Sequence, residues 1–135
     1  MDQAFFIGSS MAWTERNGGL EDQRVNFITQ HPATRHLLDS SFHELWAATD
    51  GGVFHTVNGG REWAEITLPI PDNTQFLDVP APLASQLLYI WIDYDPTNSD
   101  ILYVMAAFSE TSNRTWIYKT TDSALTWTSK GVTWL

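Results

Sequence analysis

The chain has no cysteine, which excludes disulfides and thiolate metal sites. It also has few basic residues: seven Lys and Arg stand against sixteen Asp and Glu, for a formal net charge of −9. Nucleic acids and anionic membrane surfaces attract clustered Lys and Arg, so this balance argues against both as partners. No apolar run approaches the roughly 18 residues that a transmembrane helix needs. We therefore expect neither nucleic-acid binding nor membrane insertion.

Signals for a cellular location are missing as well. The N-terminus lacks the basic region and the apolar core of a signal peptide. The lack of cysteine does not identify a compartment, because extracellular bacterial and viral proteins often lack disulfides too. The location is therefore left open, and if the protein is exported, we expect either that its signal lies outside this chain or that its export is unconventional.

Residues for metal or phosphate binding show no recognised spacing. The histidines do not follow the i, i+2 or i, i+4 pattern of metal ligands on one element, and the nearest pair, His31 and His36, spans a predicted turn. The four are His31, His36, His43 and His55. Glycine pairs at 51–52 and 59–60 belong to predicted hairpins rather than to a strand-to-helix phosphate loop. The sequence thus predicts no bound metal and no cofactor.

What the chain does have is a repeated pattern. Residues 56–63 read TVNGGREW and residues 120–127 read TTDSALTW. Both fit hydroxyl-x-Asn/Asp-x-small-x-x-Trp, and the closing tryptophans are 64 positions apart, since 127 − 63 = 64. Each copy follows a run rich in β-branched and aromatic residues. A fixed period of this length is typical of repeat proteins.

The repeated pattern has a structural logic as a hairpin turn. An Asn or Asp side chain accepts hydrogen bonds from nearby backbone amides, and the preceding hydroxyl adds a further local bond. Glycine permits the positive φ of a tight turn, so the second copy, with Ser123-Ala124 there, is expected to be less tight. The closing Trp starts the return strand and packs beneath the turn. The structural residues are Thr56, Asn58, Gly60 and Trp63 in the first copy, and Thr120, Asp122 and Trp127 in the second.

Other landmarks share the period. Pro32 and Pro96 each follow an apolar run and are also 64 positions apart. The segment from Leu45 matches the segment from Leu102, which implies a longer turn before it in the first copy. Alternation and β-branched content predict two sets of four strands. They span residues 24–30, 44–49, 52–56 and 62–67, then 87–94, 101–108, 115–120 and 126–130.

The pattern resembles the Asp-box, or BNR, repeat of β-propellers. That repeat is found in sialidases, xyloglucan-cleaving glycoside hydrolases, sortilin-type receptors and photosystem II assembly factors. The stretch LWAATDGGVF at 45–54 is similar to the xyloglucanase and sortilin-like branch. The resemblance implies an all-β fold of about two four-stranded antiparallel blades, and by analogy an extracellular location. This chain departs from the usual box at Asn58, which keeps the acceptor without the charge.

We divide the single Asp-box repeat domain into four parts. Residues 1–20 read as the end of a preceding blade with a degenerate box, 21–67 as the first blade, 68–86 as an inter-blade insertion, and 87–135 as the second blade. A propeller needs about four to eight blades to close. The alternatives are a fragment of a longer chain, a ring completed by further copies, or a small sandwich with covered edges.

Candidate functional residues are few. Glycoside hydrolysis needs two carboxyls across a cleft, and Asp93 and Asp95 share one face of a predicted strand, although they do not lie on opposite sides of a sugar. The alternative is that Asp95 caps a turn. The five arginines lack the setting of a sialidase. Three tryptophans outside the boxes could stack on sugars or fill gaps between blades: Trp46, Trp91 and Trp116.

These features together predict a non-catalytic binding or scaffold module that recognises a glycan or a protein. The alternative function is a fragment or subunit of a glycoside hydrolase acting on β-glucan or xyloglucan, which rests on resemblance alone. The long insertion, with four of the six prolines, is the segment where we expect specificity to reside. A homo-oligomer and the missing blades of a longer chain both stay open as ways to complete the fold.

Overall fold

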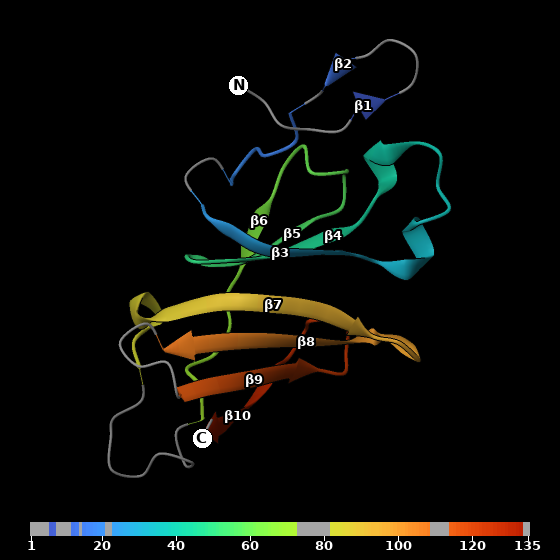
Figure 1. The fold of residues 1–135 in the computed structure, drawn as a ribbon. Helices are drawn as coiled ribbons and strands as arrows, with labels where there is room; N and C mark the ends of the chain where they lie inside the picture. Colours follow the sequence, from blue (N-terminus) through green and yellow to red (C-terminus); the bar gives the residue numbers. More distant parts are fainter. Residues whose placement is uncertain are drawn as a thin grey trace.

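Two antiparallel four-stranded sheets, one above the other, form the body of the protein (Figure 1). The computed structural model describes residues 6–7, 12–13, 15–20, 23–72, 82–108 and 114–133. The first sheet contains β3 (Val25–Gln30), β4 (Leu45–Thr49), β5 (Gly52–Thr56) and β6 (Ala64–Ile66), in that order. The second contains β7 (Leu87–Asp95), β8 (Asn98–Phe108), β9 (Arg114–Thr120) and β10 (Thr128–Thr133). The predicted all-β class and the two sets of four strands are confirmed.

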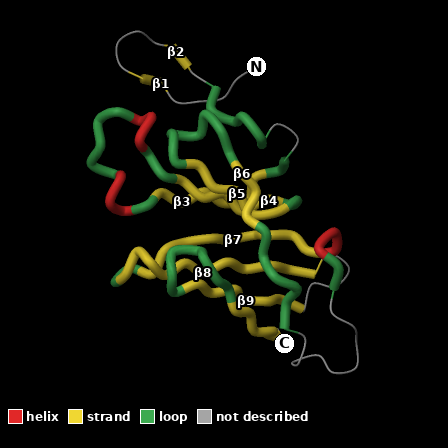
Figure 2. The backbone as a smooth tube through the Cα atoms, turned by 180° about the vertical axis from the view of Figure 1, so that it is seen from behind, coloured by secondary structure: helices red, strands yellow, loops and turns green. Residues whose placement is uncertain are grey.

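The remaining elements are short. Strands β1 (Phe6–Ile7) and β2 (Ala12–Trp13) form a separate pair, within the segment that we interpreted as the end of a preceding blade. The 3₁₀ turns are η2 (Pro32–Thr34), η3 (Ser40–Phe42) and η4 (Ala84–Gln86), as the red segments of Figure 2 show. No α-helix occurs in the described parts of the chain, and none of their helices is long and apolar enough to cross a membrane.

The two sheets have the same strand register. Leu45 pairs with Thr56 in the first sheet, and Leu102 pairs with Thr120 in the second, as the sequence alignment of the two segments requires. The first strand of each sheet also carries a bulge at the same repeat position, between 25 and 27 in β3 and between 89 and 91 in β7. A bulge bends its strand and is a specific feature rather than a random defect. The 64-residue period is therefore present in the backbone pairing as well as in the sequence.

The first box turn satisfies its own backbone donors. Thr56 Oγ1 donates to Asn58 Oδ1 at 2.8 Å and accepts from the Gly60 amide at 3.0 Å. Asn58 Oδ1 also accepts from the Glu62 amide at 3.0 Å. Trp63 follows and is 8% exposed. The hydroxyl and the amide oxygen thus replace ladder bonds that a turn cannot make.

The second box turn repeats this pattern atom for atom. Thr120 Oγ1 donates to Asp122 Oδ1 at 2.7 Å and accepts from the Ala124 amide at 3.0 Å. Asp122 Oδ1 accepts from the Thr126 amide at 2.9 Å, and its other oxygen accepts from the Thr126 hydroxyl at 2.6 Å. The two turns differ in sequence at every position except the initial threonine and the final tryptophan. Their shared geometry therefore comes from the acceptor and hydroxyl positions.

The expectation of a looser second turn is wrong. Ser123 and Ala124 adopt φ values of 57° and 72°, the same left-handed region that Gly59 and Gly60 occupy at 72° and 88°. Left-handed backbone costs a non-glycine residue about 1–2 kcal/mol. The surrounding hydrogen bonds hold the second turn in this conformation without glycine.

The main hydrophobic core lies between the two sheets. From the first sheet it receives Trp46, Ala48 and Val53, and from the second it receives residues of β7, β8 and β9, among them Ile92, Val104 and Tyr118. A smaller cluster on the outer side of the first sheet contains Leu20, Ala47, Phe54 and Trp63. Residues 67–72, which follow β6, cross the second sheet: Tyr118 donates its hydroxyl hydrogen to the Pro69 carbonyl at 2.8 Å. The rest of the long insertion, from 73 to 81, lies outside the described residues.

The two box tryptophans occupy equivalent places with different polar contacts. Trp63 packs in the outer cluster, and its indole N–H donates to the Arg16 carbonyl at 2.9 Å. Trp127 packs against the main core, on the side of its sheet that faces the first sheet, whereas Trp63 lies on the side of its own sheet where Leu20 packs. The Trp127 indole nitrogen is buried and has no hydrogen-bond partner among the described residues. Both residues thus hold the same repeat position, while the hydrogen bond is specific to the first copy.

Candidate functional site

The two predicted catalytic carboxylates lie on β7 and have separate partners. Asp93 Oδ1 accepts from the Thr29 hydroxyl at 2.7 Å and from the backbone amide of Tyr94 at 2.8 Å. Asp95 Oδ1 accepts from the Thr97 amide at 2.9 Å and from its hydroxyl at 2.7 Å. Asp95 therefore caps the turn into β8, which was the alternative to a catalytic role.

The environment of Asp95 favours its charged form. The hydrogen bond from the Thr97 hydroxyl lowers the pKa of this carboxyl, and the Thr97 amide and the Tyr103 hydroxyl act in the same direction. The Tyr103 hydroxyl lies 3.0 Å from Asp95 Oδ2. A general acid in glycoside hydrolysis needs a raised pKa, so these contacts are unsuited to that role.

The three non-box tryptophans differ in their access to solvent. Trp46 and Trp116 are only 3% and 1% exposed and belong to the core between the sheets. The Trp116 indole N–H donates to the Asp72 carbonyl at 2.9 Å. Trp91 is partly exposed and lies beside Phe27, with 6.0 Å between ring centroids. Of the three, Trp91 is the one that is not buried.

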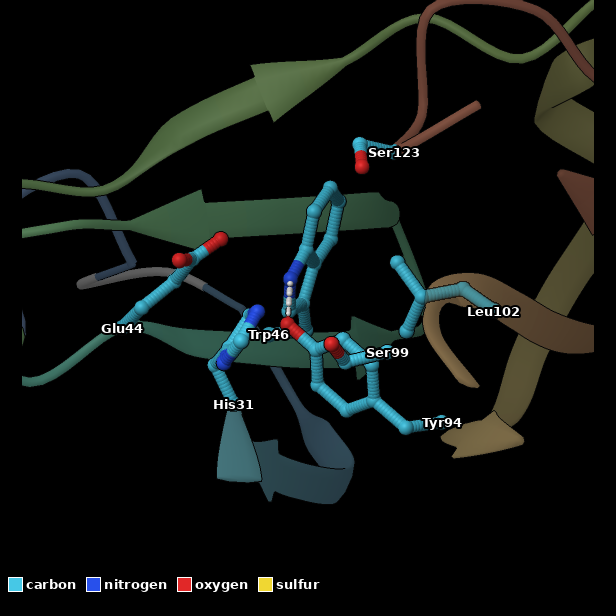
Figure 3. A pocket seen from close by; sticks show the side chains of 7 residues that line it. All are labelled: His31, Glu44, Trp46, Tyr94, Ser99, Leu102 and Ser123. Atoms are coloured by element: carbon cyan, nitrogen blue, oxygen red, sulfur yellow. Dashed lines mark hydrogen bonds between the residues drawn. The ribbon is translucent and has the colours of Figure 1, made fainter. Parts of the chain in front are cut away.

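A polar pocket opens where the two sheets meet, at the end of β3 and β7. Its volume is about 150 Å³. Figure 3 shows the side chains that line it, which come from both sheets and from the second box turn. They are His31, Glu44, Trp46, Tyr94, Ser99, Leu102 and Ser123. Trp46 is the one residue of this set that sequence analysis named as a ligand-binding candidate.

Tyr94 and Trp46 form the floor of the pocket. The Trp46 indole N–H donates to the Tyr94 hydroxyl oxygen at 2.7 Å, the dashed line in Figure 3. Burial raises the pKa of the Tyr94 hydroxyl, and the nearby Glu44 carboxylate adds to the rise. Tyr94 therefore keeps its proton at every physiological pH and can donate it to a bound group.

His31 forms one wall and offers a second donor. The Ala33 amide donates to His31 Nδ1 at 3.0 Å, so a neutral ring carries its proton on Nε2. The ring packs edge-on against Tyr94 at a centroid distance of 5.1 Å. The bond to Ala33 fixes the ring orientation because it belongs to the cap of η2.

Glu44 supplies the acceptor. Its Oε2 lies 2.8 Å from His55 Nε2, and that hydrogen bond lowers the pKa of the carboxyl despite partial burial. His55 in turn stacks on Trp46 with ring centroids 4.0 Å apart. This stack covers one face of the Trp46 ring. The ring therefore contributes to the lining of the pocket but does not offer an open face on which a sugar could stack.

The serines complete the set of polar groups. Ser99 lies near the start of β8, and Ser123 lies in the second box turn, where its hydroxyl donates to Asp100 Oδ1 at 2.8 Å. The pocket thus combines hydroxyl and imidazole donors with a carboxylate acceptor and two largely apolar side chains, Trp46 and Leu102. Such a set suits a small neutral ligand with several hydroxyl groups.

Sequence reasoning missed most of this site. His31 and Glu44 flank the longer turn of the first copy, while Tyr94 and Ser99 flank the corresponding hairpin of the second. One signal was present: polar residues follow the apolar runs at equivalent repeat positions, and loops that leave a rigid scaffold often carry binding residues. Which of them meet depends on how the sheets stack, and the sequence does not show this.

No protein-family model matches the chain, and no curated protein sequence matches it. Within the described residues, no group of three or more His, Cys, Asp or Glu side chains could hold a metal ion.

Proposed function

We propose that the chain forms two blades of an Asp-box β-propeller and acts as a non-catalytic glycan-binding module. The two box turns support the propeller assignment, because they use the same donor and acceptor atoms at equivalent positions 64 residues apart. The shared bulges and register of the two sheets support it independently. Each four-stranded sheet matches the size of one propeller blade.

The polar pocket carries the binding part of the proposal. Its volume of about 150 Å³ is below the range of about 300–1,000 Å³ for drug-sized ligands, so it fits one small unit rather than a chain of units. Tyr94 and His31 donate while Glu44 accepts, a combination that matches the hydroxyl groups of a sugar ring. A terminal or branching sugar residue of a glycan is the ligand that this chemistry fits best.

The contacts of the carboxylates favour binding over hydrolysis. Asp93 and Asp95 lie on one strand, and each already accepts a hydrogen bond from a threonine hydroxyl, that of Thr29 on the other sheet and that of Thr97 in the adjacent turn. Glu44, the carboxylate of the pocket, is paired with His55, and its lowered pKa keeps it ionised rather than ready to donate a proton. Among the residues that the structure describes, no second carboxylate lines the pocket.

Glycan-array screening followed by calorimetric titration tests this function. We expect saccharide binding by the wild-type chain and a loss of affinity of about fivefold in His31→Ala, since one lost hydrogen bond is worth about 1 kcal/mol. His36→Ala is the matched control, because His36 is exposed and does not line the pocket. Circular dichroism of both variants checks that the fold is intact.

Three outcomes would contradict parts of the proposal. If no saccharide binds, the glycan-binding function is wrong. If Trp91→Ala abolishes binding while His31→Ala does not, the ligand binds beside Trp91, near the first strands of the two sheets (β3 and β7), and the pocket assignment is wrong. If the chain hydrolyses xyloglucan and Asp93→Asn or Asp95→Asn abolishes that activity, the protein is a glycoside hydrolase instead.

A further inference from the structure

In the part of the chain that the structure describes, the outer face of the second sheet is not covered by another sheet, whereas the equivalent face of the first sheet is buried in the core. In the first sheet, three core residues face the second sheet and are at most 3% exposed: Trp46, Ala48 and Val53. The strand register identifies their counterparts in the second sheet, which lie on its outer face and are partly exposed. These are Tyr103, Met105 and Ile117. The outer face of the second sheet is thus built from the same repeat positions as a face that the fold buries.

The opposite face of the first sheet carries apolar side chains that are exposed, although their counterparts in the second sheet are buried. Val25 and Ile28 of β3 are 40% and 50% exposed. Their counterparts in β7, Tyr89 and Ile92, are 7% and 0% exposed, because the first sheet covers them. Residues 15–20 and the β1–β2 pair lie on this side of the first sheet (Figure 1), and Leu20 packs on the β4–β5 half. The inner strand β3 nevertheless keeps these two large apolar side chains open.

Charge distinguishes the outer face of the second sheet from the rest of the molecule. The chain has only two lysines, and both lie there: Lys119 is paired with Tyr103, and Lys130 is paired with Ile117. The Lys119 ammonium lies 5.5 Å from the centroid of the Tyr103 ring. In a chain with a net charge of −9, these two lysines lower the repulsion that an approaching acidic copy meets at this face, which also carries Asp93, the strand partner of Tyr103.

We propose that the outer face of the second sheet docks on the β3 side of the first sheet in a second copy of this chain. The arrangement repeats, between chains, the head-to-tail stacking that the two sheets have within one chain. Each copy offers one face of each kind, so the contact is heterologous and can continue into a closed ring. Two blades per chain and about four to eight blades per propeller give rings of two to four copies. The inference depends on the repeat register and is independent of glycan binding.

The mass in solution is the first test. We expect the wild-type chain to show a discrete multiple of 15.3 kDa in sedimentation or light scattering. Ile28→Lys and Met105→Lys, on opposite sides of the proposed contact, should each reduce the mass to that of one chain. Leu125→Lys is the control, because Leu125 is 84% exposed in a box turn away from both faces. Circular dichroism checks that each variant stays folded.

The lack of native cysteine allows a cross-linking test of the geometry. Ile28→Cys and Met105→Cys are purified separately, mixed and oxidised. Their counterparts within one chain, Ile92 and Ala48, belong to the same buried cluster, so we expect the mixture to form a disulfide-linked dimer. Each variant alone, and Ile28→Cys mixed with Leu125→Cys, should form little.

Other results overturn the proposal. A single-chain mass at every concentration tested means that these faces are covered by blades of a longer chain or are left open. A multimer that survives both lysine substitutions, or one that links Ile28→Cys to itself, means that copies associate through a different surface. The saccharide titration is run on the Met105→Lys chain as well, so a failure of assembly is distinguished from a failure of glycan binding.

Discussion

At the scale of single residues, the box acceptor shows which property the turn requires. Asn58 is neutral and Asp122 is charged, yet each side-chain oxygen accepts from the amide four residues later, at 3.0 Å and 2.9 Å. The oxygen, and not the charge, is therefore what builds the turn. The charge has a separate effect, which is to make the stability of the second turn depend on pH.

Asp122 should contribute to acid sensitivity. Hydrogen bonds from the Thr126 hydroxyl and amide lower the pKa of this carboxyl from 3.8 to about 2. A group whose folded pKa is depressed stabilises the fold above its unfolded pKa and loses that contribution as pH falls through the folded value. We expect the melting temperature of the wild type to fall more than that of Asp122→Asn between about pH 4 and pH 2. Thermal unfolding at matched pH values measures the difference, and parallel curves for the two chains would contradict it.

At the scale of elements, the loops around each box explain which turn needs glycine. In the first copy, η3 packs against the box, so a Cβ on Gly59 would meet the Ser40 carbonyl oxygen, well inside contact distance. The Gly59 amide also donates to the His43 carbonyl at 2.9 Å. In the second copy, the short hairpin between β7 and β8 replaces that loop, and the Ser123 amide donates to the Asp100 carbonyl at 3.0 Å. A side chain is accepted where the neighbouring loop is short.

A pair of matched substitutions tests this explanation. Gly59→Ser should lower the free energy of unfolding by about 2–4 kcal/mol, because it combines a backbone clash with a strained φ. Ser123→Gly, the reverse change at the equivalent position, should alter it by less than about 1 kcal/mol, since relieved strain offsets the lost hydrogen bond to Asp100. Urea denaturation of both variants provides the values. Similar losses in the two variants would show that the loop is not the cause.

The first strands of the two sheets contact each other at equivalent repeat positions. β3 and β7 bring together residues that are one repeat apart: the Thr29 hydroxyl bonds Asp93, and Phe27 lies beside Trp91. Contacts between equivalent positions of successive repeats are what stacking by a constant rotation produces. Such contacts could not be predicted from the alternation of polar and apolar residues within one strand.

At the scale of the whole molecule, the two sheets share one core and should unfold together. Residues from both sheets belong to the main cluster, and a bridge at the bulges ties the sheets at their inner edge. Asn26, the bulged residue of β3, donates from Nδ2 to Asp50 Oδ1 and to the Tyr89 carbonyl, both at 2.8 Å. Its counterpart Ile90 is 38% exposed and makes no such bridge.

Asn26→Ala should therefore destabilise the whole fold. We expect a loss of about 1–3 kcal/mol, because two acceptors lose their donor and one of them is charged. Ile90→Ala, at the equivalent position, should change stability by at most about 0.5 kcal/mol. Far-UV circular dichroism and tryptophan fluorescence should report the same midpoint in each variant, as expected for one cooperative unit. Two separate transitions would mean that the sheets unfold independently.

Much of the fold could be predicted from the sequence because its determinants are local. All eight predicted strands of the two sheets are present, with ends that differ by at most three residues. Thr120 and Asp122 indicate their turn because their partners lie within four residues along the chain. The pocket could not be predicted, since its residues lie on segments that meet only across the gap between the sheets.

The sequence by itself determined the strands, the two turns and the period, since each depends on neighbours a few residues away. Only the tertiary structure decided which side chains are buried between the sheets and which remain exposed to solvent. Trp46 and Trp116 were buried by the facing sheet, while Trp91 remained at the inner edge. Stacking also joined His31 to Tyr94 and placed both lysines on one outer face. The physical reason is that a strand specifies its two faces, whereas the face that becomes buried depends on what packs against it.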